Sequence, residues 1–174
     1  MFHIRPACPA DWPAIWSVLE PVFRQGDTYA VDRDISEHAA RRDWCSLPLR
    51  TFVACDATGQ VLGTSIVKAN QRGGGRHVAN AAFVVDQAAR GRGVVATLCV
   101  HAQDYAHALG FTAMQFNFVV ATNLGAVRLW KRLGFAIVGT LPSAFDHPVH
   151  GCVDAHVMHK SLTGSDSLIT ETPS

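Results

Sequence analysis

A glycine-rich turn with two arginines is the segment of this sequence best suited to chemistry. It reads Arg90-Gly91-Arg92-Gly93 and lies between an apolar run that ends at Val85 and a long segment with apolar residues at helical spacing. A turn of this kind at the start of a helix exposes backbone N–H groups at the positive end of the helix dipole. Glycines leave the backbone accessible, and arginines add positive charge. The turn therefore predicts an anion site of the kind that holds a pyrophosphate.

Two known phosphate fingerprints do not fit this turn. The spacing Gly91-x-Gly93-x-x-Ala96 matches the dinucleotide pattern, but four predicted strands precede it and no acidic residue follows at the distance that would hold a ribose. A P-loop needs a lysine and a hydroxyl residue where this chain has Val94 and Val95. We therefore favour neither a Rossmann site nor nucleotide hydrolysis.

Histidines near the C-terminus raise the question of a metal site. His147, His150 and Cys152 fall within six residues, and His156 and His159 follow. Alternate strand residues point to opposite faces, so the last two histidines diverge, and no Cys-x-x-Cys or His-Glu-x-x-His motif accompanies them. We expect ordinary surface and loop histidines and no metal.

The elements that must position the glycine turn follow from apolar periodicity and turn residues. The predicted strands begin with a short one at Ile4 and continue with the runs 51–55, 61–69, 78–85, 114–120, 135–139 and 153–159. The predicted helices are one with Asp11 as its N-cap, one at about 36–44, one after Gly93 and one at 123–133. This order predicts an α+β fold, in which a mixed, mostly antiparallel sheet of six to seven strands is flanked by about four helices.

Composition limits the classes of protein to which this chain can belong. It has 174 residues, 48% of them apolar and 17% charged, with a formal net charge of +1. These values predict one domain over residues 1–162 with a flexible tail at 163–174, and they favour neither disorder nor a nucleic-acid partner. No run is apolar and long enough to predict a membrane span, and five scattered cysteines suit a reducing cytoplasm.

The glycine turn and a later segment resemble the GCN5-related N-acetyltransferase (GNAT) superfamily. Arg90 to Val95 is similar to its R/Q-x-x-G-x-G/A element, and Asn123-x-x-Ala126-x-x-Leu129-Trp130-x-x-Leu133-Gly134-Phe135 is similar to its second motif. Both stand in the family's order with one predicted strand between them. Further segments, among them Gly26-Asp27-Thr28-Tyr29 and His77-Val78-Ala79-Asn80, resemble the branch of the yeast enzyme that acetylates proline analogues such as azetidine-2-carboxylate.

The resemblance implies the GNAT fold and an acetyl-CoA site. The backbone of Phe83 and Val85 would pair with the pantetheine arm, and Asn123 would contact the arm from the other side. The pyrophosphate would be held by the segment Arg90, Gly91, Arg92, Gly93, Val94, Val95 and Ala96. Each of these assignments is carried over from the motifs.

Two residues depart from the family pattern. Val95 stands where the pattern has Gly or Ala, so its side chain would approach the phosphates. Trp130 stands where many members carry a tyrosine that protonates the departing thiolate, and an indole N–H is a poor acid. We expect Trp130 to pack beside the thioester. A tyrosine acid would then have to be Tyr29, or the thiolate leaves unprotonated.

The resemblance leads to the hypothesis that the chain transfers an acetyl group from acetyl-CoA to the amine of a small molecule, such as an amino or imino acid, by direct attack in a ternary complex. The amine must first lose a proton, for which Asp27, Tyr29 and His77 are candidates. The alternatives are acetylation of a protein N-terminus or lysine, and a non-catalytic acyl-CoA sensor. A homodimer is left open.

Asn80 and Asn117 are amides inside apolar strand runs, where an unpaired polar group costs about 1–3 kcal/mol. In the family fold their strands diverge where acetyl-CoA enters, so both amides would face the gap and hold the acceptor, with Phe83 as the apolar wall. A backbone N–H near Phe83 would hold the oxyanion. Alternate residues of a strand point to opposite faces, so Asn80 and Phe83 can face the same cleft only if a β-bulge lies between them. The alternative is that each amide pairs with neighbouring backbone.

Overall fold

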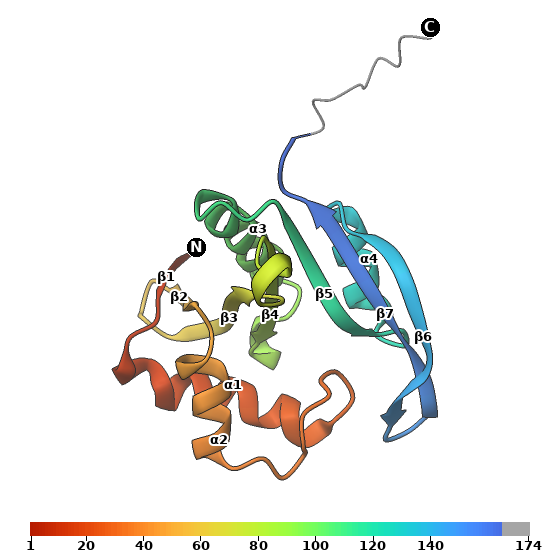
Figure 1. The fold of residues 1–174 in the computed structure, drawn as a ribbon. Coiled ribbons are helices and arrows are strands. Elements are labelled where there is room, and N and C mark those ends of the chain that lie inside the picture. Colours follow the sequence, from red (N-terminus) through yellow and green to blue (C-terminus); the bar gives the residue numbers. More distant parts are fainter. Residues whose placement is uncertain (165–174) are drawn as a thin grey trace, which may run out of the picture.

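Seven strands form one sheet in the order β1-β2-β3-β4-β5-β7-β6 in the computed structural model of this chain (Figure 1). The strands are β1 (Phe2–Pro6), β2 (Arg50–Asp56), β3 (Val61–Ala69), β4 (Val78–Val85), β5 (Ala113–Val120), β6 (Ala136–His147) and β7 (Gly151–Ser161). The helices are α1 (Trp12–Gln25), α2 (Glu37–Arg41), α3 (Val94–Ala108) and α4 (Leu124–Arg132). The predicted α+β class and its mixed sheet are confirmed.

The structure describes residues 1–164, so all but the first two residues of the predicted tail lie outside the described residues. Within residues 1–164, no helix is long and apolar enough to cross a membrane.

Alternation along the central strands sends side chains to two separate cores. On one face, Val53, Ile66 and Val84 pack with buried residues of α1 and with Trp44, which follows α2. On the other face, Val67 and Phe83 pack with α3, α4 and β5. Helices therefore cover both faces of the sheet, and β4 lies between the two layers.

The contact between β4 and β5 is short, and it divides the sheet into two parts. This is the one parallel pair among the strand pairs of the described chain, and it is registered only at Val78↔Ala113 and Ala79↔Met114. Beyond these residues the strands diverge, as Figure 1 shows for β5 beside β4. The other edge of β4 remains paired with β3, from Ala79↔Ala69 to Val85↔Gly63. The divergence expected from the resemblance is confirmed, and it leaves one backbone edge of β4 without a neighbouring strand.

The last two strands are longer than the sequence pattern predicts. Predicted strands at 135–139 and 153–159 extend to Ala136–His147 and Gly151–Ser161, which form one long hairpin. The pairing continues past Pro142 through two irregularities in register. Because β6 is the outer strand of the sheet, a proline there interrupts no further ladder. The hairpin carries its tip, with His147, well beyond the end predicted for the strand.

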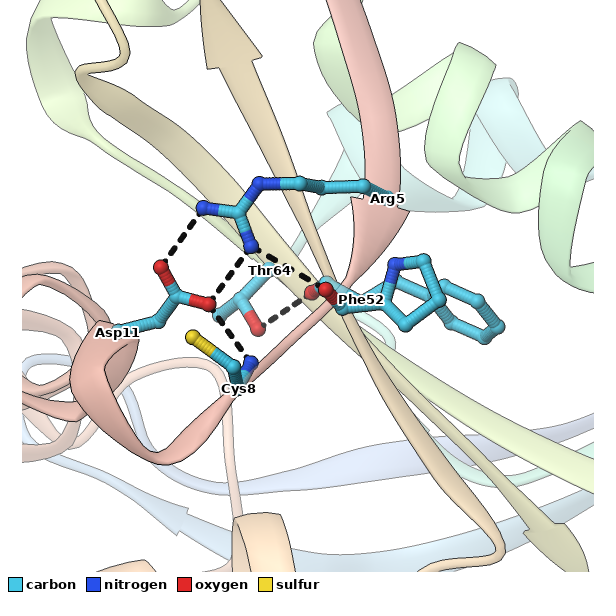
Figure 2. Close-up of polar contacts among 6 residues, drawn as sticks. Arg5, Cys8, Asp11, Phe52 and Thr64 are labelled. Atoms are coloured by element: carbon cyan, nitrogen blue, oxygen red, sulfur yellow. Dashed lines mark hydrogen bonds and ion pairs between the residues drawn. The ribbon is translucent and has the colours of Figure 1, made fainter.

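Asp11 does not cap α1 as predicted. Its carboxylate makes no side-chain cap for that helix and instead accepts from Cys8 N–H at 2.7 Å. The same carboxylate accepts two hydrogen bonds of 2.7 Å from the Arg5 guanidinium, a bidentate pair drawn in Figure 2. The pair holds the pKa of Asp11 well below its usual range and ties β1 to the start of α1.

Candidate functional site

A cavity of about 660 Å³ opens where β4 and β5 diverge. It reaches from the glycine turn before α3, along β4 and β5, to the segment after α1 and the tip of the β6–β7 hairpin. Among its lining residues are Asp27, Thr28, Tyr29, Phe83, Val85, Arg90, Gly91, Val95, Phe116, Phe118, Asn123, Trp130, His147 and His150. Segments far apart in the sequence thus meet around one space.

The glycine turn has the backbone conformation that an anion site needs. Gly91 and Gly93 have φ of +77° and +79°, which glycine adopts without strain, and a Cβ added at either position would meet no atom within 4 Å. Within residues 1–164, no acceptor is found for the N–H groups of Gly91, Gly93 and the first turn of α3 (Val94, Val95, Ala96). These donors therefore lie together at the positive end of a helix of 15 residues.

The residues around the turn differ in how close they lie to the cavity. Arg90 and Val95 line it, whereas the exposed Arg92 does not. Val95 is half-buried and packs against the core beside α3, so part of its side chain is directed away from the turn. This placement reduces the crowding that the sequence predicts at Val95.

The free edge of β4 carries the backbone groups of Phe83 and Val85. Asp86 N–H donates to Leu62 O of the β3 side at 2.9 Å, and backbone groups alternate along a strand, so those of Val85 and Phe83 point to the gap instead. The Tyr29 hydroxyl donates to Phe83 O at 2.6 Å and accepts from Phe83 N–H at 3.2 Å. Burial raises the pKa of Tyr29 to about 12, so this hydroxyl keeps its proton at neutral pH.

Asn123 and Trp130 form part of the wall opposite β4. Asn123 is the N-cap of α4, where its Oδ1 accepts from Ala126 N–H at 3.2 Å. Within the described chain its Nδ2 donates to no acceptor, so a donor remains beside the cavity. The Trp130 ring is buried against Phe83 and Phe116, with ring centroids 5.4 and 5.0 Å away. Its environment is that of a packing residue.

The far end of the cavity is polar and comes from two separate segments. Asp27 accepts from Gln25 Nε2 at 2.7 Å and from Thr28 Oγ1 at 2.9 Å. Across the cavity, His147 Nδ1 accepts from the N–H groups of Val149 and His150 at 3.1 and 3.3 Å. With Nδ1 accepting, the neutral ring carries its proton on Nε2, which makes His147 a hydrogen-bond donor at its other edge.

Three of the predicted acceptor residues are not among those that line the cavity. Asn80 Nδ2 donates to the backbone carbonyl of Gln115 at 2.8 Å, as the alternative of backbone pairing predicts. Asn117 Nδ2 donates instead to a side-chain oxygen, Asn70 Oδ1, at 2.6 Å. The β-bulge expected between Asn80 and Phe83 is absent, because the β3–β4 register is regular from Ala79 to Val85. His77 lies instead in a shallow depression with Gly73, Gly74 and Arg76.

Sequence reasoning missed several cavity residues. The sequence predicts no site role for Phe118 or His150, and it raises His147 only as a candidate metal ligand, whereas all three line the cavity. Within residues 1–164, no group of three or more His, Cys, Asp or Glu side chains could hold a metal ion. For His147 the available signal was the apolar residues on both sides of Pro142, Leu141 and Phe145, which allow the strand to continue to His147. Phe118 and His150 left no such signal.

Comparisons with known proteins agree with this geometry. A model of the acetyltransferase (GNAT) family matches residues 12–135. The N-acetyltransferase aca1 of Schizosaccharomyces pombe is 35% identical in an alignment of 151 residues that covers 78% of this chain and 72% of that protein. The structure of a GCN5-related N-acetyltransferase from Kribbella flavida has a TM-score of 0.88 and 48% identity, covering 92% of this chain and 97% of that one.

A more distant structure shares the fold. It is a phosphinothricin acetyltransferase from Sinorhizobium meliloti in complex with AcCoA, with a TM-score of 0.84 at 21% identity, covering 98% of this chain and 94% of that one. The sheet that diverges at β4 and β5, the glycine turn before α3 and the family model over residues 12–135 agree: this chain belongs to the acetyltransferase (GNAT) family.

Proposed function

We propose that this protein transfers the acetyl group of acetyl-CoA to the amine of a small acceptor. The observation that carries the proposal is that one cavity is lined both by Gly91 and Val95, at the turn with free N–H groups, and by the polar side chains of Asp27 and His147. Acetyl-CoA supplies the acetyl group as a thioester. The remaining tasks are to bind both molecules, to align them and to remove the proton of the amine, and these belong to residues of this chain.

The residues present fit acetyl-CoA. The N–H groups of Gly91 and Gly93 to Ala96 would hold the pyrophosphate, with the Arg90 guanidinium beside them, because within residues 1–164 these donors have no protein acceptor. The edge of β4 at Phe83 and Val85 would hold the pantetheine arm, since a strand edge pairs with any extended chain of amides. The free Nδ2 of Asn123 would approach the arm from the opposite wall.

A small acceptor suits the polar end of the cavity better than a peptide. Asp27 and Thr28 from the segment after α1 and His147 and His150 from the hairpin tip all line this cavity, so two separate parts of the chain would contact an acceptor there. Asp27 would accept the proton of the amine, and His147 Nε2–H would donate to an anionic group of the same molecule. An amino or imino acid carries both groups, and proline analogues belong to this class.

The experiment is an acceptor screen at saturating acetyl-CoA. Purified protein is mixed with acetyl-CoA and a panel of amines that includes proline, azetidine-2-carboxylate, amines without a carboxylate and lysine-containing peptides, and CoA thiol release is measured. We expect multiple turnovers only with small amines, and the highest kcat/KM with those that carry a carboxylate. Turnover of peptides alone would replace the small-acceptor proposal, and tight acetyl-CoA binding without turnover would identify a sensor.

A further inference from the structure

The Tyr29 hydroxyl satisfies both backbone groups of Phe83 at once. It donates to the carbonyl at 2.6 Å and accepts from the N–H at 3.2 Å, across 54 residues of sequence. Without Tyr29, these two groups would face the gap unpaired, because β5 leaves β4 after Ala79. An unpaired buried backbone group costs about 1–3 kcal/mol, so one side chain removes a substantial penalty from the edge of β4.

The position that Tyr29 occupies is the one that the proposed function assigns to the pantetheine arm. A backbone N–H has a single proton to donate, whereas a carbonyl oxygen accepts two hydrogen bonds. Tyr29 and a ligand can therefore share the Phe83 carbonyl, but they compete for the Phe83 N–H. Within the described chain, the hydroxyl of Tyr29 forms hydrogen bonds only with Phe83. The ring makes an edge contact with Phe23, with ring centroids 6.1 Å apart, which is an apolar contact.

We propose that Tyr29 is an internal placeholder for acetyl-CoA: its hydroxyl holds the Phe83 N–H in the free protein and is displaced when the arm of acetyl-CoA pairs with β4. The inference rests on the proposed function. Asp27 and Thr28 directly precede Tyr29 in the chain and line the cavity, so a movement of Tyr29 would be passed to the segment proposed to hold the acceptor. Binding of acetyl-CoA thereby changes the end of the cavity that receives the amine, and Tyr29 is the positioning residue that connects the two ends.

The test is the affinity of Tyr29→Phe for acetyl-CoA, measured by calorimetry without an acceptor. Removing the hydroxyl removes the competitor, so we expect acetyl-CoA and CoA to bind about three- to tenfold more tightly than they bind to the wild type. Adenosine 3′-phosphate 5′-diphosphate, which has the phosphates of CoA but no pantetheine arm, should bind both proteins equally. A residue that is merely structural would weaken binding when replaced, or leave it unchanged.

Tyr105→Phe is the matched control, because Tyr105 lies on α3, packs against Phe52 at 4.9 Å and does not line the cavity. Its affinity for acetyl-CoA should equal that of the wild type. Equal or weaker acetyl-CoA binding by folded Tyr29→Phe would overturn the placeholder. Failure of the wild type to bind acetyl-CoA would overturn the proposed function instead, so the two failures are distinguishable.

Discussion

The two ends of the cavity are built in different ways. At the glycine turn, the groups left free within residues 1–164 are backbone N–H groups of one short segment, Gly91 and Gly93 to Ala96, in which Gly91 and Gly93 have positive φ. At the acceptor end, they are side chains from the segment after α1 and from the hairpin tip, more than one hundred residues apart in the sequence. Backbone donors recognise one ligand regardless of side chains, whereas side chains can be exchanged without altering the fold.

This difference explains which end a sequence can reveal. A turn made of adjacent residues leaves a motif, so the anion site follows directly from Arg90 to Gly93. The acceptor end leaves no motif, since Asp27 and His147 meet only through the tertiary fold. If the two ends are independent, substitutions should affect the affinity for acetyl-CoA or the kinetics of the acceptor, but not both.

Asp27→Asn should have the largest effect, and only at the acceptor end. An amide of the same shape keeps an oxygen for Thr28 but cannot take the proton of the amine, so we expect acceptor kcat/KM to fall about a thousandfold. The affinity for acetyl-CoA, from calorimetry, should stay within a factor of two. Asp32→Asn, on an exposed residue of the same segment that does not line the cavity, is the control and should behave as wild type. Normal turnover by Asp27→Asn would move the base elsewhere.

Gly93→Leu should act in the opposite way. A leucine at φ of +79° is strained, and its side chain would fill the open space where the anion is expected, so acetyl-CoA should bind on the order of 30-fold more weakly. Gly59→Leu is the control for backbone strain. Gly59 has φ of +87° and no atom within 4 Å of an added Cβ, but it lies in the β2–β3 turn and does not line the cavity. Equal loss of affinity in both variants would show that strain alone is responsible.

The fold and the cofactor end were largely predictable, and the reasons are local. Periodicity located the central strands, and the glycine turn located the start of α3 to the residue. The extension of β6 was missed because Gly139, Pro142 and Ser143 are typical of turns, and because the outer strand of a sheet tolerates them. The cap at Asp11 was assigned wrongly because its carboxylate pairs with Arg5, a partner that only the tertiary fold brings near.

The acceptor residues illustrate the same limit. Asn80 and Asn117 were chosen because amides within strands need partners, and the structure supplies those partners locally, from Gln115 O and Asn70 Oδ1. Polarity within an apolar run therefore identified residues that join β4, β5 and the chain after β3. It did not identify the residues that line the cavity, because burial and direction depend on where two strands diverge.

Asn80→Ala tests whether Asn80 joins β4 to β5 or instead binds the acceptor. Loss of the donor to Gln115 O should lower the free energy of unfolding by about 1 kcal/mol, measured by urea denaturation, while acceptor kcat/KM changes less than threefold. Asn117→Ala, on an exposed residue, should cost less stability. A tenfold or greater fall in acceptor kcat/KM for Asn80→Ala, with acetyl-CoA binding intact, would instead restore the acceptor role predicted from the resemblance.

Asp11→Asn should have the smallest effect and should leave both ends intact. It weakens the pair with Arg5, whose side chain is 38% exposed, so we expect a loss of about 0.5–1 kcal/mol in unfolding free energy at pH 7. Because the pKa of Asp11 is lower in the folded state than in the unfolded state, the pair stabilises the folded protein above about pH 4. This contribution disappears as the pH falls further, so the unfolding free energies of wild type and variant should become equal in acid. Asp43→Asn, in the exposed pair with Arg42, is the control and should change the unfolding free energy at pH 7 by less than about 0.5 kcal/mol.

The two-residue seam between β4 and β5 has a consequence for the folding of the whole chain. Within residues 1–164, strand pairing joins four strands on one side to three on the other at Val78↔Ala113 and Ala79↔Met114, and the hydrogen bond from Asn80 Nδ2 to Gln115 O reinforces this seam. A molecule that lies along the free edge of β4 acts as an eighth strand, since it supplies hydrogen bonds that the sheet itself lacks. Compounds that carry a pantetheine arm would then serve as pharmacological chaperones, raising the melting temperature and the yield of refolded protein as their concentration rises above the Kd.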